Sequence, residues 1–170
     1  MIEIITLLSL FSALVILGFL TIIDLKERLL PNILVAPFFI CGIIFHLSLS
    51  FHYLTPTDIA LGVLIGGGPL YIIRILAMRF YGPNAMGLGD VKLMGAAGAW
   101  LGPYAILIAV TAGALAGLAH GLAVFAHTWF KKKILLDLNK LSIPAGPGFI
   151  IGILVAAVME FQNLFIVLFP

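Results

Sequence analysis

The stretch VKLMGAAGAWLGPYAILIAVTAGALAGLAHGLAVFAH, residues 91–127, decides how this chain is folded. It is almost free of charge, and it is too long for one crossing of a lipid bilayer, which takes about 20 apolar residues. Gly102-Pro103 inside it is a natural turn, because proline cannot continue a helix and glycine adopts backbone angles that other residues avoid. We therefore expect a short helix over Val91–Leu101, which covers only about half of the hydrocarbon, and a long helix from Pro103 to about Phe130.

Four further apolar runs complete the predicted architecture: Ile4–Ile23, Ile33–Leu49, Ile59–Ala77 and Ile150–Leu168. Hydrophobic residues make up 63% of the 170 residues and charged residues 9%. A soluble globular domain has about 45–50% apolar and about 25% charged residues. The sequence therefore predicts an all-α, polytopic membrane protein with about six transmembrane helices, forming a single transmembrane domain over residues 1–170.

The basic residues orient this arrangement. With six spans and the N-terminus outside, the cytoplasmic loops are Asp24–Asn32, Arg74–Lys92 and Lys131–Lys140, and they contain all nine Lys and Arg residues of the chain. This is the positive-inside pattern. A single crossing by residues 91–127 would move the last of these loops outside and break the pattern. We expect a multi-pass protein of the inner (cytoplasmic) membrane, embedded in its lipid bilayer.

Two acidic residues stand at the edges of apolar runs on this cytoplasmic face. Asp24 follows the first run, and Asp90 opens the fourth within Gly87-Leu88-Gly89-Asp90. A carboxylate at a membrane edge costs free energy, which makes it a candidate functional group. Each acid also has a structural explanation. Asp90 can cap the helix that it opens, with the glycines simply forming a turn. Asp24 can be a boundary residue, as an acid that ends a span most often is. In the functional interpretation, the glycines let an extended peptide backbone approach Asp90.

The two neighbourhoods belong to a set of motifs that follow one another along most of the chain: Asp24-Leu25-Lys26-Glu27-Arg28-Leu29-Leu30-Pro31-Asn32, Gly87-Leu88-Gly89-Asp90-Val91-Lys92-Leu93-Met94, Gly98-Ala99-Trp100-Leu101-Gly102 and Ile143-Pro144-Ala145-Gly146-Pro147. Together they resemble the type IV prepilin peptidases, membrane-embedded aspartic proteases of the G-x-G-D kind. Presenilin-like proteases share that short pattern, but the surrounding residues fit the prepilin group better. The resemblance implies an enzyme that cuts the short basic leader from pilin or pseudopilin precursors at the cytoplasmic face.

The resemblance also implies site residues and a mechanism. Asp24 and Asp90 map to the catalytic aspartates, and Gly87 and Gly89 to the motif that positions the substrate. Two neighbouring carboxylates hold one proton between them, so one can activate a water while the other donates a hydrogen bond to the developing oxyanion. Asp90 opens a helix, where the helix dipole favours negative charge, whereas Asp24 closes one. We therefore expect Asp90 to be the base.

One departure from the family pattern concerns the loop Asp24–Asn32. Many bacterial members carry an insertion there with paired cysteines, linked to N-methylation of the new terminus, and this loop holds no cysteine. We therefore expect the short, peptidase-only form, in which N-methyltransferase activity is unlikely.

An alternative function is an ion-coupled small membrane transporter in which Asp24 and Asp90 bind the ion. Transporters often contain repeated halves with acids near the bilayer midplane, whereas this chain shows no internal repeat and both acids lie near one face. A non-catalytic scaffold would leave the ordered motifs unexplained. His120 and His127 share a helical face, but no third ligand has suitable spacing, so we expect no metal site. We also expect no cofactor and no nucleic-acid partner, and the sequence carries no signal for an oligomeric state.

Overall fold

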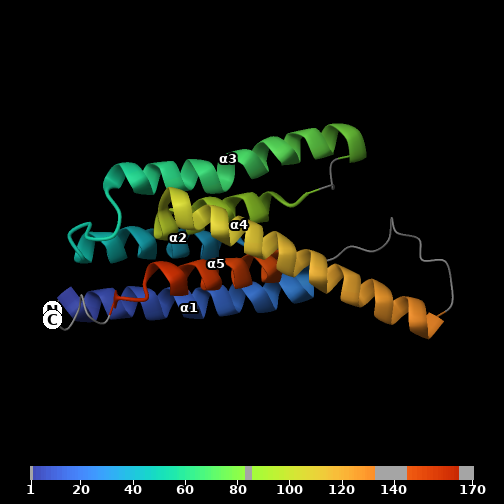
Figure 1. The fold of residues 1–170 in the computed structure, drawn as a ribbon, viewed down its shortest axis with the longest axis horizontal. Helices are drawn as coiled ribbons and strands as arrows, with labels where there is room; N and C mark the ends of the chain where they lie inside the picture. Colours follow the sequence, from blue (N-terminus) through green and yellow to red (C-terminus); the bar gives the residue numbers. More distant parts are fainter. Residues whose placement is uncertain (1, 83–85, 133–144, 165–170) are drawn as a thin grey trace.

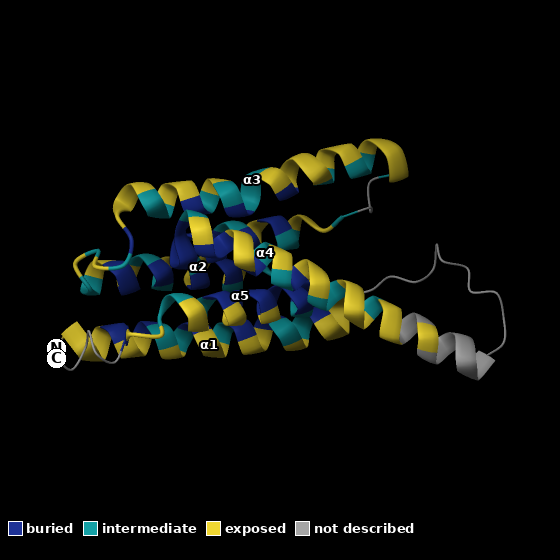
Figure 2. Cartoon of the chain, viewed as in Figure 1, coloured by how far each residue is buried: buried dark blue, intermediate teal, exposed yellow. Residues whose placement is uncertain are grey.

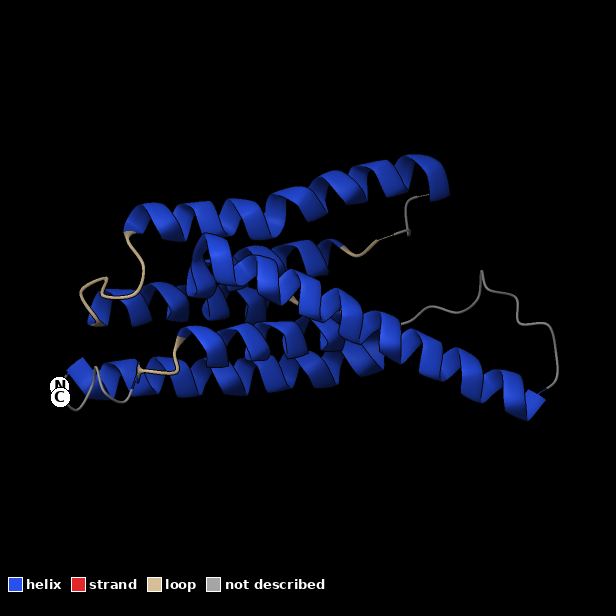
Figure 3. Cartoon of the chain, in the orientation of Figure 1, coloured by secondary structure: helices blue, strands red, loops and turns tan. Residues whose placement is uncertain are grey.

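The computed structural model describes residues 2–82, 86–132 and 145–164 and is helical throughout most of these ranges (Figure 3). Its elements, in chain order, are α1 (Ile2–Glu27), α2 (Asn32–Ser48), α3 (Pro56–Tyr81), α4 (Leu88–Lys132) and α5 (Gly146–Glu160). The prediction of an all-α fold is confirmed. Most of the loop Lys131–Lys140, the His127 side chain and the end of the Ile150–Leu168 run lie outside the described residues.

α4 is two helices joined at a sharp turn. Gly102 has φ 67° and ψ −173°, which is not helical, and Pro103 follows it directly. A side chain added at Gly66 of α3 would touch both Met94 and Ile106, residues that a straight helix would hold about 18 Å apart. The chain therefore folds back at Gly102, as Figure 1 shows, and the predicted division of residues 91–127 is confirmed. We refer to residues 88–101 and 103–132 as the first and second halves of α4.

Small residues let the helices around α4 pack with their backbones in contact. Gly62 of α3 and Gly98 of α4 face each other so closely that a Cβ on either would overlap the other helix. Gly113 and Gly148 form an equivalent contact between the second half of α4 and α5. Close approach through small residues is typical of membrane helices, where van der Waals packing supplies much of the association free energy. The first half of α4 lies at the centre of the bundle, since Leu93, Met94 and Ala97 have no exposed surface.

The outer surface of the bundle is strongly apolar. Exposed residues run along the outward sides of the helices (Figure 2), and they include Phe11, Ile33 and Tyr104, with exposed fractions of 65%, 79% and 84%. Within the described residues, α1, α3 and the segment Leu88–Ala123 are long and apolar enough to cross a membrane, and α2 and α5 are shorter apolar helices. An apolar surface this extensive requires a lipid environment, and the chain is a membrane protein.

α5 differs from the expected last span in where it starts and stops. It begins at Gly146, four residues before the predicted run, because Pro147 fits the first turn of a helix, where its missing N–H is not needed. It ends at Glu160, and the Phe161 N–H bonds back to Ala157. The early start brings the N-terminus of α5 next to the end of α1.

Candidate active site

Asp24 ends a stripe of buried residues along α1: Thr6, Ser9, Ala13, Leu17, Leu20 and Asp24. These positions recur every three or four residues, so they share the helix face that packs into the bundle. Asp24 is only 5% exposed, and its Oδ2 accepts a hydrogen bond from the backbone N–H of Gly146, with the nitrogen 3.1 Å from the oxygen. The last turn of α1 and the first residue of α5 therefore hold the carboxyl group between them.

Asp90 lies in the first turn of α4 and is partly buried. Leu30, in the loop that follows α1, lies against Gly89 directly before Asp90, so the end of α1 lies beside the start of α4, where the charges of the two acids interact. The fold thus brings the two acids together at one end of the bundle, where α1 ends and α4 and α5 begin (Figure 1). That they cut a peptide bond stays a prediction at this point.

The two glycines of the Gly87–Asp90 motif have different surroundings. Gly87 is exposed, and a Cβ there would lie 3.1 Å from Oδ2 of Asp90. Gly89 faces the loop between α1 and α2 instead, where an added Cβ would lie 2.8 Å from Cβ of Leu30. Gly87 therefore leaves the carboxyl group of Asp90 open to approach, while Gly89 allows the loop after Asp24 to pack directly on α4.

Two basic side chains tie neighbouring helices to this region. Arg74 of α3 donates from Nε to the carbonyl oxygen of Met86 at 3.2 Å, immediately before Gly87. Lys92 of α4 donates from Nζ to Oδ1 of Asn32, at the start of α2, at 3.0 Å. In the sequence these two residues indicate only the topology. No sequence pattern predicts that these side chains form hydrogen bonds to a different segment of the chain.

The N-terminus of α5 reduces the electrostatic difference between the two acids. The expectation that Asp90 is the base considers only the helices that carry the two acids. Asp24 closes α1, but its Oδ2 also faces the first N–H of α5, where the helix dipole is positive. Asp24 thus lies between the C-terminus of α1 and the N-terminus of α5, whose dipoles act on it in opposite senses, so the helix dipoles distinguish the two acids less than α1 and α4 alone suggest.

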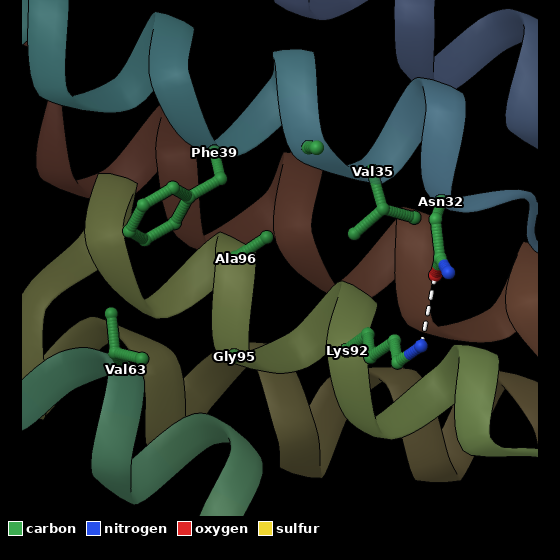
Figure 4. A pocket seen from close by; sticks show the side chains of 8 residues that line it. Asn32, Val35, Phe39, Val63, Lys92, Gly95 and Ala96 are labelled. Atoms are coloured by element: carbon green, nitrogen blue, oxygen red, sulfur yellow. Dashed lines mark hydrogen bonds between the residues drawn. The ribbon is translucent and has the colours of Figure 1, made fainter.

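An apolar pocket of about 460 Å³ lies close by but faces away from the acids. Its lining is Asn32, Val35, Ala36, Phe39, Val63, Lys92, Gly95 and Ala96. At about 100° per residue, the three lining residues from α4 lie on the side of that helix opposite Asp90. Figure 4 shows the pocket between α2, α3 and α4, closed at one end by the bond from Lys92 to Asn32. This pocket is not where a substrate would meet the acids.

No cluster of three or more His, Cys, Asp or Glu side chains that could hold a metal ion occurs in the part of the chain that the structure describes.

The sequence model of the type IV leader peptidase family matches residues 10–122, which include Asp24 and the whole Gly87–Asp90 motif. The chain belongs to this family. The resemblance inferred from the motifs is thereby confirmed. The family match stops before α5, so the contact between Asp24 and Gly146 is known from the structure of this chain alone.

Curated relatives carry the name prepilin leader peptidase/N-methyltransferase. The protein from Pectobacterium carotovorum subsp. carotovorum is 38% identical over 114 residues, which cover 65% of this chain and 40% of the relative. The protein from Neisseria gonorrhoeae is 33% identical over 106 residues, or 62% and 36% of the two chains. The protein from Xanthomonas campestris pv. campestris is 33% identical over 126 residues, or 72% and 42%. The chain thus spans less than half the length of these relatives, and no solved structure matches it.

Proposed function

We propose that this chain is a membrane-embedded aspartic endopeptidase that removes the short basic leader from type IV prepilin-like precursors. The observation that carries the proposal is the pair formed by buried Asp24 and partly buried Asp90 at one end of the bundle. Membership of the type IV leader peptidase family supports the substrate class, since leader removal is what the family's description and the relatives' names state. An ion-coupled transporter, the alternative, is not favoured by that membership.

We infer six crossings of the inner membrane, with the acids at the cytoplasmic side. α1 and α3 are each long and apolar enough for a full span, and so is the segment Leu88–Ala123, whose part after Gly102 is about 31 Å long as a helix. α2 and α5 are shorter apolar helices. The first half of α4 would be the sixth segment and would cross only part of the bilayer, because the chain turns back at Gly102 after about 21 Å of helix. Lys26 and Lys92 lie at the same end of the bundle as the acids, which the positive-inside rule places in the cytoplasm.

The proposed mechanism uses one proton shared by the two acids, because like charges this close disfavour double ionisation. The ionised carboxylate takes a proton from a water as the water oxygen bonds to the scissile carbonyl carbon. The protonated carboxyl donates a hydrogen bond to the oxygen that becomes negative. When the tetrahedral intermediate collapses, a proton passes to the leaving amine and the C–N bond breaks, which releases the leader with a new carboxyl group.

We further propose that this chain lacks N-methyltransferase activity. The connection from Asp24 to Asn32 is short, and Leu30 within it packs against Gly89 at the start of α4. The α1–α2 connection therefore packs directly on the start of α4, and it contains no cytoplasmic insertion of the kind linked to N-methylation.

A direct test incubates the purified protein in lipid with a pilin-like precursor and measures the mobility of the product. Wild type should release a shortened product, while Asp24→Asn and Asp90→Asn should release none. Asp58→Asn is the matched control, because Asp58 is an exposed capping residue at the start of α3 and should cut like wild type. Normal cleavage by either active-site variant would exclude the pair, and no cleavage of any precursor in a panel by wild type would exclude the substrate class.

A further inference from the structure

α5 begins without a capping side chain of its own. Ala145 occupies the N-cap position and makes no side-chain hydrogen bond there, and Pro147 has no N–H to offer. The N–H of Gly146 donates instead to Oδ2 of Asp24, a residue 122 positions away on α1. Asp24 therefore caps α5 from another helix. Because Gly146 is buried as well, neither group can exchange this bond freely for one to water.

Gly146 also provides the space that the carboxyl group occupies. A Cβ at this position would lie 2.5 Å from Oδ2 of Asp24 and 2.9 Å from its Cγ, well inside van der Waals contact. Backbone conformation does not explain the glycine, since the described glycines with positive φ are Gly82 and Gly102. An alanine would suit the first turn of a helix, so the steric demand at this position comes from Asp24.

We propose that Gly146 is the positioning residue for Asp24 in the cleavage reaction, a role that rests on the proposed function. Its N–H binds Oδ2 and fixes the rotation of the carboxyl group, and its missing side chain lets the carboxyl group reach that place. With Oδ2 bound to α5, Oδ1 is the oxygen that shares the proton with Asp90 or binds the attacking water. A placement error of about 1 Å in such a group can reduce a rate by about 100-fold.

The kinetic test compares Gly146→Ala with Gly148→Ala. Both positions are crowded, but a Cβ at Gly148 would meet the backbone of α4, 2.9 Å from the carbonyl oxygen of Gly113, and not Asp24. Gly146→Ala should lower kcat for precursor cleavage by about 10- to 100-fold with KM within about twofold. Gly148→Ala should reduce the yield of folded protein and leave kcat per folded molecule near wild type. An unchanged kcat in Gly146→Ala would overturn the positioning role.

A stability test needs no activity and checks the contact itself. Asp24→Ala removes Oδ2 and Cγ and leaves Cβ, which lies 3.3 Å from the point that a Cβ at position 146 would occupy. Gly146→Ala should therefore lower the melting temperature clearly in the wild-type background and much less in the Asp24→Ala background. Gly148→Ala should lower it equally in both. Equal losses for Gly146→Ala would overturn the contact, whereas coupling without any precursor cleavage would refute the proposed function and leave the contact standing.

Discussion

Asp24 has two proposed roles, a charge for catalysis and a cap for α5, and two substitutions separate them. Asp24→Ala removes both and leaves the N–H of Gly146 buried without its acceptor, which costs about 1–3 kcal/mol of unfolding free energy. Asp24→Asn removes the charge but keeps an amide oxygen that can accept the same N–H, so the loss should be below about 1 kcal/mol. At about 2–4 °C per kcal/mol for a chain of this size, the melting temperatures of the two variants should differ by several degrees.

The assay is thermal unfolding in one fixed detergent or lipid, paired with precursor cleavage. Both variants should be inactive, and only Asp24→Ala should unfold clearly earlier than wild type. Asp58→Asn again serves as the control, because its carboxyl group caps α3 at an exposed site. If Asp24→Ala and Asp24→Asn melt at the same temperature, Asp24 does not cap α5 and the geometry described for Gly146 is wrong.

Three further predictions concern the supports of the site and the fold. Gly89→Ala should lower the unfolding free energy by about 1–3 kcal/mol, because its Cβ would press on Leu30, and a thermal melt measures this loss. Arg74→Met should reduce kcat for precursor cleavage several-fold with little change in melting temperature, because the carbonyl of Met86 loses its donor beside the motif while the helix core is untouched. The kcat of Arg74→Lys should lie between those of wild type and Arg74→Met. Gly102→Ala should destabilise the protein by at least about 1–3 kcal/mol, because φ 67° with ψ −173° is a conformation found almost only in glycine and an added Cβ would lie 2.5 Å from Leu54; denaturation in mixed detergent measures that loss.

The features that the sequence predicted correctly depend on local chemistry. Gly102-Pro103 marks the turn in α4 because glycine permits the positive φ and proline ends the helix before it. The grouping of the basic residues placed both acids at one end of the chain's helices, and the fold has them there.

The features that the sequence did not predict depend on contacts between distant segments. Gly146 and Asp24 are 122 residues apart, and neither periodicity nor charge signals that a helix N-terminus will meet that carboxyl group. The motif around Gly89 points only to substrate positioning, whereas the surroundings of this glycine are set by Leu30 on another segment. The expectation that Asp90 is the base considers only α1 and α4, because the sequence does not show that the N-terminus of α5 lies against Asp24.

A double-mutant cycle on precursor cleavage by Asp24→Asn, Asp90→Asn and the double variant tests whether the two acids act as one catalytic pair. Two acids that act as one unit should each, when removed, reduce kcat/KM by about 10,000-fold, and the double variant should be no worse than either single one. If the losses multiply in the double variant, or if a single variant keeps substantial activity, Asp24 and Asp90 do not act as a catalytic pair.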